Sequence, residues 1–223
     1  MTLSLQDCST GFPAELKSFR QFILSLDDEQ WTRPSRCGGW TVADVAAHVV
    51  GTMADVAAGR MDGLGTPEVT EREVAERRGR SRAEVAEELE GVTKVAEDLL
   101  AAFDDDAWQA PAPGGYDGTL GQGVEALFYD TWLHADDMRA PLGLESQRGG
   151  EGLRAAVHHV GFEAGKRGYG PATLALDGVE QVAVGDGSGP RIAGDPFEFV
   201  LVATGRKDGE PGAFGGVPNI YAD

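Results

Sequence analysis

Residues 120–138 carry the clearest helical pattern in this chain of 223 residues. Their apolar side chains recur every three or four positions, which predicts a helix with one apolar face. Asp130 and His134 are four residues apart, so they project side by side from this helix at the edge of that face. The pair is either a surface ion pair, which is the common case, or two ligands of a metal ion whose third ligand lies elsewhere. The apolar stripe comprises Leu120, Val124, Leu127, Phe128, Thr131, His134, Ala135 and Met138.

Three further long segments show the same periodicity, and two of them begin with a capping signal. Thr41 and Ser81 are each followed three residues later by an acid, so both can cap a helix N-terminus. Residues 1–12 are expected to form a loosely held leader, and residues 66–77 a short helix. Four long amphipathic helices joined by connectors of different lengths predict a four-helix bundle. These helices are expected to start at Pro13, Thr41, Ser81 and Leu120.

The pattern changes period after about residue 148, within a glycine-rich segment. A helix over residues 153–165 is followed by short apolar or alternating runs at 173–177 and 182–184, bounded by glycines, which favour strands. A last helix is expected from Pro196 to Thr204. The fold class predicted is therefore α+β. The domains expected are a four-helix bundle over residues 1–145 and a small α/β domain over residues 150–223.

Charge and composition exclude several classes of function. The net charge is −18, from 37 acidic and 19 basic residues, and such a field repels nucleic-acid phosphates and anionic lipid. No run of 18 apolar residues predicts a membrane span, and the N-terminus lacks the pattern of a secretory signal. Two distant cysteines do not form a disulfide framework. We expect a cytoplasmic protein, a monomer or weak dimer, with no nucleic-acid or membrane partner.

His48 can supply the ligand that Asp130 and His134 lack. Side chains from facing helices of a bundle can converge on one internal site. Two histidines and one carboxylate bind zinc and leave a fourth position open, although the same set suits iron, and nickel also fits. The alternative is a histidine hydrogen-bonded to Asp44 or Asp55. Sequence spacing does not show whether the two helices face each other.

Three segments, in order, resemble one protein family. Cys37-Gly-Gly-Trp-Thr-Val-Ala-Asp-Val-Ala-Ala-His48 resembles the signature of the mycothiol-dependent maleylpyruvate isomerase-like proteins, which belong to the DinB-like metal-binding bundles. Asp130-Thr-Trp-Leu-His134 is similar to the family's second motif, a carboxylate and a histidine four residues apart. Phe197–Arg206 is similar to the apolar helix ending in Thr-Gly-Arg of the family's smaller C-terminal domain. The ordered set spans nearly the whole chain.

The resemblance implies a ligand set and a cosubstrate. His48, Asp130 and His134 would bind one divalent metal, most often zinc, with nickel or iron as alternatives. Isomerase-type members have a glutamate as the carboxylate ligand, where this chain has Asp130, as some subgroups do. Arg206 would hold a carboxylate of the substrate, and a mycothiol-like thiol would be the cosubstrate. The alternative role for Arg206 is to stabilise the end of the preceding helix.

The resemblance implies a thiol-dependent enzyme acting on a small electrophile. A metal with an open position can hold a thiol as thiolate. The activity expected is an S-transferase or a maleylpyruvate isomerase-like cis–trans isomerase. The chain contains no GxSxG, P-loop or dinucleotide fingerprint. The alternatives are a metal-stabilised binding module without turnover and a metal-dependent hydrolase that activates water.

Three other chemically capable residues are given structural interpretations. Cys37 precedes a helix N-terminus, where the pKa of a thiol tends to fall, but it is interpreted as part of a turn. His158 and His159 are expected to be exposed residues of the helix over 153–165.

Overall fold

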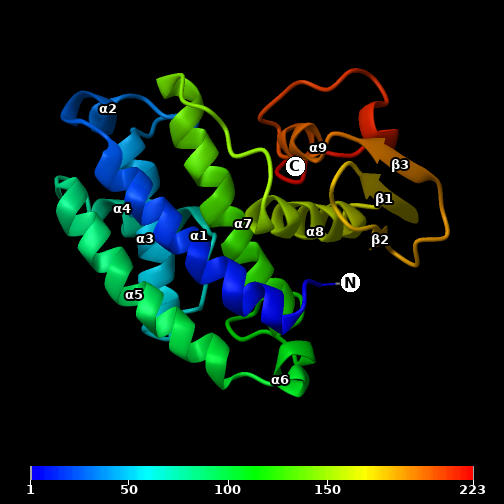
Figure 1. Ribbon diagram of the computed structural model, residues 1–223, viewed down its shortest axis with the longest axis horizontal. Coiled ribbons are helices and arrows are strands. Elements are labelled where there is room, and N and C mark those ends of the chain that lie inside the picture. The colour runs from blue at the N-terminus through cyan, green and yellow to red at the C-terminus, as the bar shows by residue number, and fades with distance from the viewer. Residues whose placement is uncertain (1, 223) are drawn as a thin grey trace. The chain divides into compact units, whose positions relative to one another are not determined.

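The computed structural model describes residues 2–222, whose contacts form two compact units. One unit comprises residues 4–147, and the other comprises residues 148–222 together with residues 2–3. Figure 1 shows the first unit as a group of helices and the second as helices with a small sheet. The predicted α+β class is confirmed. Among residues 2–222, no helix has the length and apolar character needed to cross a membrane.

Four long helices form the bundle of the first unit. Helix α1 packs against α5 and α7, and α3 packs against the same two helices, so each long helix has two long neighbours. The predicted bundle is confirmed, with α3 and α7 adjacent. These helices are α1 (Leu5–Ser25), α3 (Val42–Ala57), α5 (Arg82–Ala102) and α7 (Leu120–Arg139). Their core is filled by apolar side chains that include Leu16, Phe19, Val45, Leu89 and Phe128.

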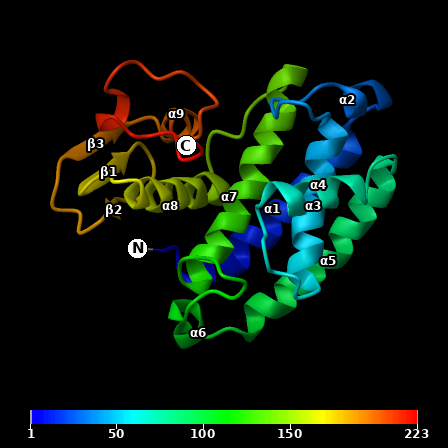
Figure 2. The same ribbon diagram turned by 180° about the vertical axis from the view of Figure 1, so that it is seen from behind.

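Shorter helices occupy the connections of the bundle. Helix α4 packs against α3, which Figure 2 shows from behind, and it matches the short helix expected near residues 66–77. Thr66 caps α4, with Pro67 in its first turn. The short elements are α2 (Asp28–Thr32), α4 (Pro67–Ala75), α6 (Asp105–Gln109) and the 3-10 turn η1 (Ala140–Leu142).

The leader expected over residues 1–12 is wrong, because α1 already begins at Leu5. The Ser4 hydroxyl accepts a hydrogen bond from the Asp7 amide and caps the helix. Cys8 and Phe12 are buried and extend the apolar stripe toward the N-terminus. Pro13 therefore lies inside the helix and not in its first turn. The capping residue Ser4 precedes the segment from which the helix is predicted, so the predicted start at Pro13 lies eight residues after the observed start at Leu5.

Similar local signals begin the two helices that carry the candidate site. Thr41 forms a capping box with Asp44 at the start of α3, as predicted. Thr119 forms the same arrangement with Gln122 at the start of α7. Each threonine also closes its preceding loop through an isolated β-bridge to a proline, Pro34 and Pro111 respectively. These contacts fix where each helix begins. Because the helix has a regular period, they also fix the direction in which its later side chains point.

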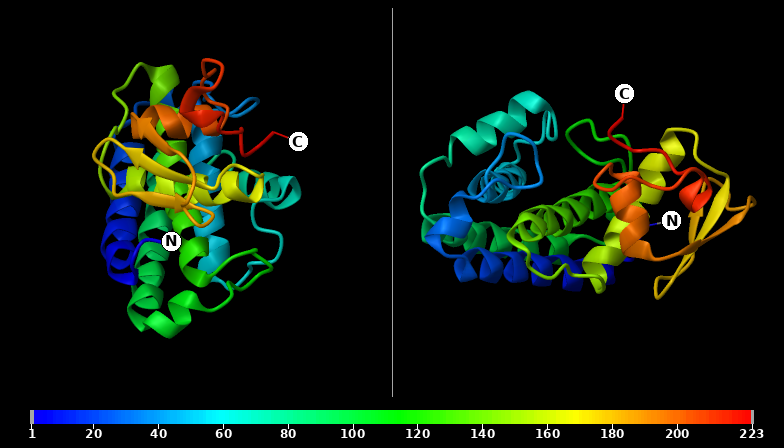
Figure 3. Two further views of the ribbon diagram at one scale, coloured as in Figure 1. Left: turned by 90° about the vertical axis from the view of Figure 1, so that its right-hand side faces the viewer. Right: turned by 90° about the horizontal axis from the view of Figure 1, so that it is seen from above.

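The second unit packs helices against a three-stranded sheet of order β2-β1-β3. Strand β1 is antiparallel to β2 and parallel to β3, and both predicted strands are confirmed. Figure 3 looks onto the sheet in its left panel. Gly161 lets α8 approach the sheet closely, because a Cβ there would lie 3.1 Å from Leu174 Cδ1. The elements are α8 (Glu151–Lys166), β1 (Ala172–Leu176), β2 (Val182–Val184), β3 (Arg191–Gly194), α9 (Pro196–Ala203) and the 3-10 turn η2 (Ala213–Gly215).

The expectation that His158 and His159 are exposed is wrong. Both side chains are buried on α8. His158 Nε2 lies 3.0 Å from Glu180 Oε1, and Arg154 donates two hydrogen bonds to the same carboxylate. Glu180 follows β1 and is 22 residues from His158 in the sequence, so helical periodicity gives no sign of this partner.

Candidate metal centre

Three predicted ligands converge between α3 and α7. Asp130 Oδ1 lies 3.3 Å from His134 Nε2, and Asp130 Oδ2 lies 3.6 Å from His48 Nε2. The two imidazole rings meet edge to face, with their centroids 5.1 Å apart. One ligand atom from each residue falls within 4.8 Å of the others. The structure thus brings His48, Asp130 and His134 together, a proximity that spacing along the chain does not reveal.

Both imidazoles present Nε2 to Asp130 because their Nδ1 atoms are engaged elsewhere. His48 Nδ1 lies 3.0 Å from Glu73 Oε2, and His134 Nδ1 lies 3.0 Å from Asp137 Oδ2. Since a carboxylate accepts the hydrogen bond, each ring carries its proton on Nδ1 in the neutral form, which leaves Nε2 as an electron-pair donor. Metal-binding histidines are commonly oriented in this way.

Charges within the cluster oppose the effect of burial. Burial acts to raise the pKa of Asp130, but His134 and His48 outweigh it and hold that pKa well below its usual range. Burial likewise acts to lower the pKa of His134, while Asp130 and Asp137 raise it well above its ordinary value. The pKa of His48 is also raised, by Asp130 and Glu73 against burial. The cluster is therefore one coupled set of two imidazoles and surrounding carboxylates.

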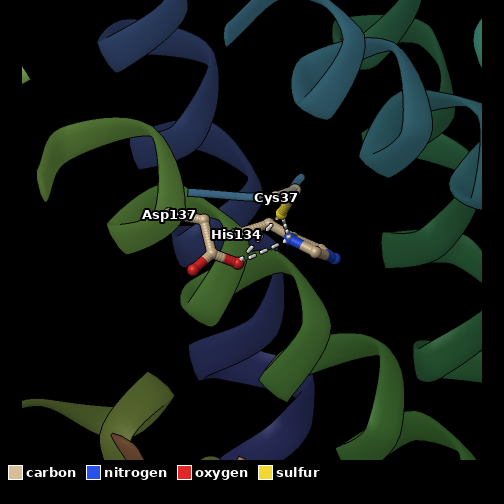
Figure 4. A group of neighbouring side chains, drawn as sticks. All are labelled: Cys37, His134 and Asp137. Atoms are coloured by element: carbon tan, nitrogen blue, oxygen red, sulfur yellow. Dashed lines mark hydrogen bonds and ion pairs between the residues drawn. The ribbon is translucent and has the colours of Figure 1, made fainter. Parts of the chain in front are cut away.

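The loop before α3 brings a thiol to the same histidine. Arg36 is tied to α7 by its amide, which donates to the Asp137 carbonyl, and by its guanidinium, 2.8 Å from Asp136 and 3.2 Å from Asp137. Cys37, next along the chain, donates its thiol hydrogen to Asp137 Oδ2 at 3.4 Å, and its sulfur lies 3.7 Å from His134 Nδ1. Figure 4 shows Cys37 and Asp137 on the same nitrogen of His134.

The donor set has the residue types of a divalent-metal site, and two of its separations are close to those between ligands of a tetrahedral ion. Ligand atoms at zinc–nitrogen and zinc–oxygen bond lengths lie roughly 3.3–3.6 Å from one another. The two separations observed from Asp130 to the imidazoles are 3.3 and 3.6 Å. The Asp130 side chain is 28% exposed, compared with 9% for His48, so the carboxylate is more accessible to solvent than the His48 ring.

A second group, Cys37 with His134 and Asp137, also has the residue types of a metal site. It shares His134 with the first group, and it uses the nitrogen that donates to Asp137. The guanidinium of Arg36 beside Asp137 disfavours another cation there. We therefore interpret Cys37 and Asp137 as residues that orient the His134 ring, and not as ligands of a second metal ion.

Sequence reasoning missed the orienting residues. Glu73 lies 25 positions from His48 and comes from α4, while the partners considered for His48 have other roles. Asp44 completes the capping box and pairs with Arg78, and Asp55 pairs with Arg60 and Arg72. The only signal for Asp137 is its spacing of three from His134 on one helix. Cys37 does lie in a turn, as interpreted, and also contacts His134.

Arg206 belongs to the second unit. It follows the C-terminus of α9, which ends at the predicted Thr204–Gly205 step. Its side chain is half-buried, with a guanidinium nitrogen 3.4 Å from the Thr204 carbonyl and the guanidinium 5.9 Å from the Tyr221 ring centroid. These contacts support the role of stabilising the helix end, and its predicted contact with substrate stays a prediction.

Comparison with known proteins adds a family and a fold. Residues 12–139 match the family described as the mycothiol maleylpyruvate isomerase N-terminal domain. The crystal structure of a mycothiol-dependent maleylpyruvate isomerase is similar, with a TM-score of 0.61 and 19% identity over 93% of this chain and 92% of that one. A histidine-to-alanine mutant of such an isomerase gives a TM-score of 0.61 and 18% identity over 92% and 90% of the two chains. No curated protein sequence matches. At this identity the structures establish the fold.

Proposed function

The chain belongs to the family defined by the mycothiol maleylpyruvate isomerase N-terminal domain, and from that premise we propose that it is a metal-dependent enzyme that activates a low-molecular-weight thiol. The thiol would be mycothiol-like, and the second substrate a small electrophile. The reaction would be cis–trans isomerisation or S-transfer. A cytoplasmic location, expected from the sequence, is part of this proposal.

One observation carries the proposal: both imidazole Nε2 atoms and the Asp130 carboxylate converge within the segment that defines the family. His48, Asp130 and His134 would hold the metal, and three protein ligands leave a position for a substrate atom. A metal ion such as zinc held by these residues would supply thiolate at neutral pH, because a coordinating thiol loses its proton.

The protein's own residues would position the reactants. The thiolate sulfur would add to one carbon of an electrophilic C=C bond, so that a C–S bond forms as the π bond breaks and its electron pair moves onto the conjugated electron-withdrawing group. In an isomerase, rotation about the adjacent bond precedes elimination of the same thiolate, so the thiol is regenerated. In a transferase the C–S bond would be retained, and the adjacent carbon would take up a proton from solvent. We propose that Arg206 binds a carboxylate of the electrophile, since its planar fork matches that group.

Turnover of an electrophile panel, with and without a small thiol, tests this function. Metal-loaded wild-type protein is compared with His134→Ala, which lacks one ligand, and with His158→Ala, a buried histidine of the second unit, as the control. We expect turnover that requires thiol and is lost in His134→Ala but kept in His158→Ala. Circular dichroism of His134→Ala checks that the helices of the bundle are still folded, so that a loss of turnover can be assigned to the missing ligand.

Two other outcomes would redirect the proposal. Equal rates without thiol would indicate the hydrolase, in which the metal activates water. No turnover of any electrophile by a metal-loaded, thiol-saturated sample would indicate the binding module without turnover.

A further inference from the structure

Glu73 reaches the candidate metal centre from a helix outside the four-helix bundle. It lies on α4, and its side chain is fully buried against α3. One oxygen, Oε2, accepts from His48 Nδ1 at 3.0 Å and from the Thr52 hydroxyl at 3.1 Å. Both donors lie on one face of α3, four residues apart. Glu73 is thus aimed at the nitrogen of His48 that does not face Asp130.

Among residues 2–222, no arginine or lysine forms an ion pair with this carboxyl group, whose only ion-pair partner is His48. Its second oxygen, Oε1, is buried with no hydrogen-bond partner among the described residues. The nearby Arg77 directs its guanidinium to Glu88 and to the Glu73 backbone carbonyl. A buried oxygen without a partner costs stability. An acid placed in this way contributes poorly to the fold, so its orientation toward His48 needs another explanation.

A glycine permits the close approach of α4 to α3 at this point. Gly51 lies inside α3, where glycine lowers helix stability relative to alanine. A Cβ at position 51 would lie 2.5 Å from Glu73 Cβ and 2.9 Å from Glu73 Cγ, so the two side chains could not both stay in place. The absence of a side chain at Gly51 is therefore a condition for the Glu73–His48 contact.

We propose that Glu73 is a positioning residue that holds His48 with its proton on Nδ1 and its Nε2 turned toward the cation site shared with Asp130 and His134. The inference rests on the proposed function, since it assigns Glu73 a role at that site. His134 is oriented from its own helix by Asp137, whereas His48 depends on a carboxylate from α4. The position of α4 thereby becomes part of the metal centre.

Two variants and a matched control separate this role from packing. Glu73→Gln keeps the size but replaces the charged acceptor by an amide, whose NH2 group can face His48. Gly51→Ala keeps the acid but displaces it. The control is Asp55→Asn, because Asp55 is buried on α3 and binds Arg72 of α4 without touching His48. It weakens the same pair of helices and leaves the imidazole contact intact.

The readouts are zinc affinity, by competition with a chromogenic chelator, and the tautomer of His48 in metal-free protein, by nitrogen-15 NMR of labelled histidine. The chain has four histidines, so the spectrum can be assigned by substitution. We expect Glu73→Gln to lose roughly 10- to 100-fold in zinc affinity, the usual cost of losing an orienting partner. Its neutral His48 should lose the preference for the Nδ1–H form. Gly51→Ala should likewise lower the zinc affinity and the preference of His48 for the Nδ1–H form. Asp55→Asn should change neither quantity.

The outcomes separate this inference from the proposed function. Wild-type zinc affinity retained within twofold in Glu73→Gln, with the Nδ1–H form of His48 unchanged, would overturn the positioning role and leave the proposed function standing. A wild-type protein that takes up no zinc would overturn both. Equal losses in Glu73→Gln and Asp55→Asn would show that packing of α4 is responsible and would overturn the inference.

Discussion

Buried histidines contact carboxylates in both units, but only the carboxylate of the second unit also binds an arginine. In the second unit Glu180 binds His158 and is also clamped by two nitrogens of Arg154, at 2.8 and 2.7 Å. In the bundle, Asp130 faces the imidazoles of His48 and His134, and no arginine or lysine of residues 2–222 forms an ion pair with it. A guanidinium stays charged and has no electron pair to donate, whereas an imidazole that gives up a proton can bind a metal through Nε2. The comparison explains why only the bundle cluster is proposed as a metal centre.

Removing a histidine from each unit tests most strongly whether only the histidines of the bundle bind metal. His48→Ala or His134→Ala should abolish zinc binding and thiol-dependent turnover, a loss greater than the roughly 100-fold cost of losing an orienting partner. His158→Ala should keep the full metal content. Elemental analysis of the three purified variants, with turnover, provides the measurement. Equal metal content in His134→Ala and His158→Ala would remove the distinction between the units.

The length of the acidic side chain is the next test. Asp130 already lies 3.3 and 3.6 Å from the two Nε2 atoms, so an added methylene in Asp130→Glu should misplace the metal. A displacement of 1 Å costs roughly 100-fold in rate. Asp130→Asn keeps the length and removes the charge, so zinc affinity should fall without vanishing. If Asp130→Glu equals or exceeds the wild-type rate, the pocket suits a carboxylate on a longer side chain.

Arg206 gives a smaller expected effect. Arg206→Ala should raise KM for an acidic electrophile by about tenfold, which corresponds to one charge-assisted hydrogen bond, and leave metal content unchanged. Arg206→Lys should restore part of the loss. Arg148→Ala is the control, since that exposed arginine of the second unit pairs with Asp195. Steady-state kinetics on an acidic and a neutral electrophile are compared, and equal KM changes for both would contradict carboxylate binding.

The clamped acid of the second unit should contribute to stability alone. Arg154, with help from His158, lowers the pKa of Glu180 to about 2, against 4.5 ordinarily. The stabilisation is therefore present above about pH 4.5 and is lost as pH falls toward 2. Glu180→Gln should cost roughly 1 kcal/mol at pH 7, after allowance for solvent screening of a partly exposed pair. Urea unfolding at pH 7 and pH 3 measures this cost, and it should shrink at pH 3 with metal content unchanged throughout.

Glu15 of the bundle, a half-buried acid with no imidazole beside it, shows the opposite pKa shift. Burial raises the pKa of Glu15 to about 6, and Arg139 only partly offsets it. Because the folded pKa lies above the unfolded one, stability falls as pH rises from about 4.5 through 6. Glu15→Gln should remove this loss and raise unfolding free energy by up to about 1 kcal/mol at pH 7. Urea unfolding at pH 4 and pH 7 tests it; no gain at pH 7 would contradict the burial effect.

Local signals predicted the bundle because helix starts are encoded within four residues. Thr41 with Asp44 and Ser81 with Glu84 both form the expected capping boxes. The start of α1 differs from the sequence prediction because Pro13 resembles a residue of a first helical turn, although the stripe continues back through Phe12 and Cys8 to the Ser4 cap. The strands were predicted from short apolar runs bounded by glycines, which are also local features.

The candidate site depends on contacts between distant segments, which local patterns do not encode. Asp130 and His134 were paired by spacing, but their approach to His48 required α3 and α7 to be adjacent. The contact of Glu73 with His48 depends on how α4 packs, and Cys37 reaches His134 across 97 residues. The same limit explains His158, whose partner Glu180 belongs to a loop.

Anomalous diffraction at the zinc absorption edge, from crystals of zinc-loaded wild-type protein, tests the central claim most directly. We expect one strong peak per chain in contact with His48 Nε2, His134 Nε2 and the Asp130 carboxylate. A peak held by Cys37, His134 Nδ1 and Asp137, or no peak in the bundle of a protein saturated with zinc, would contradict the assignment.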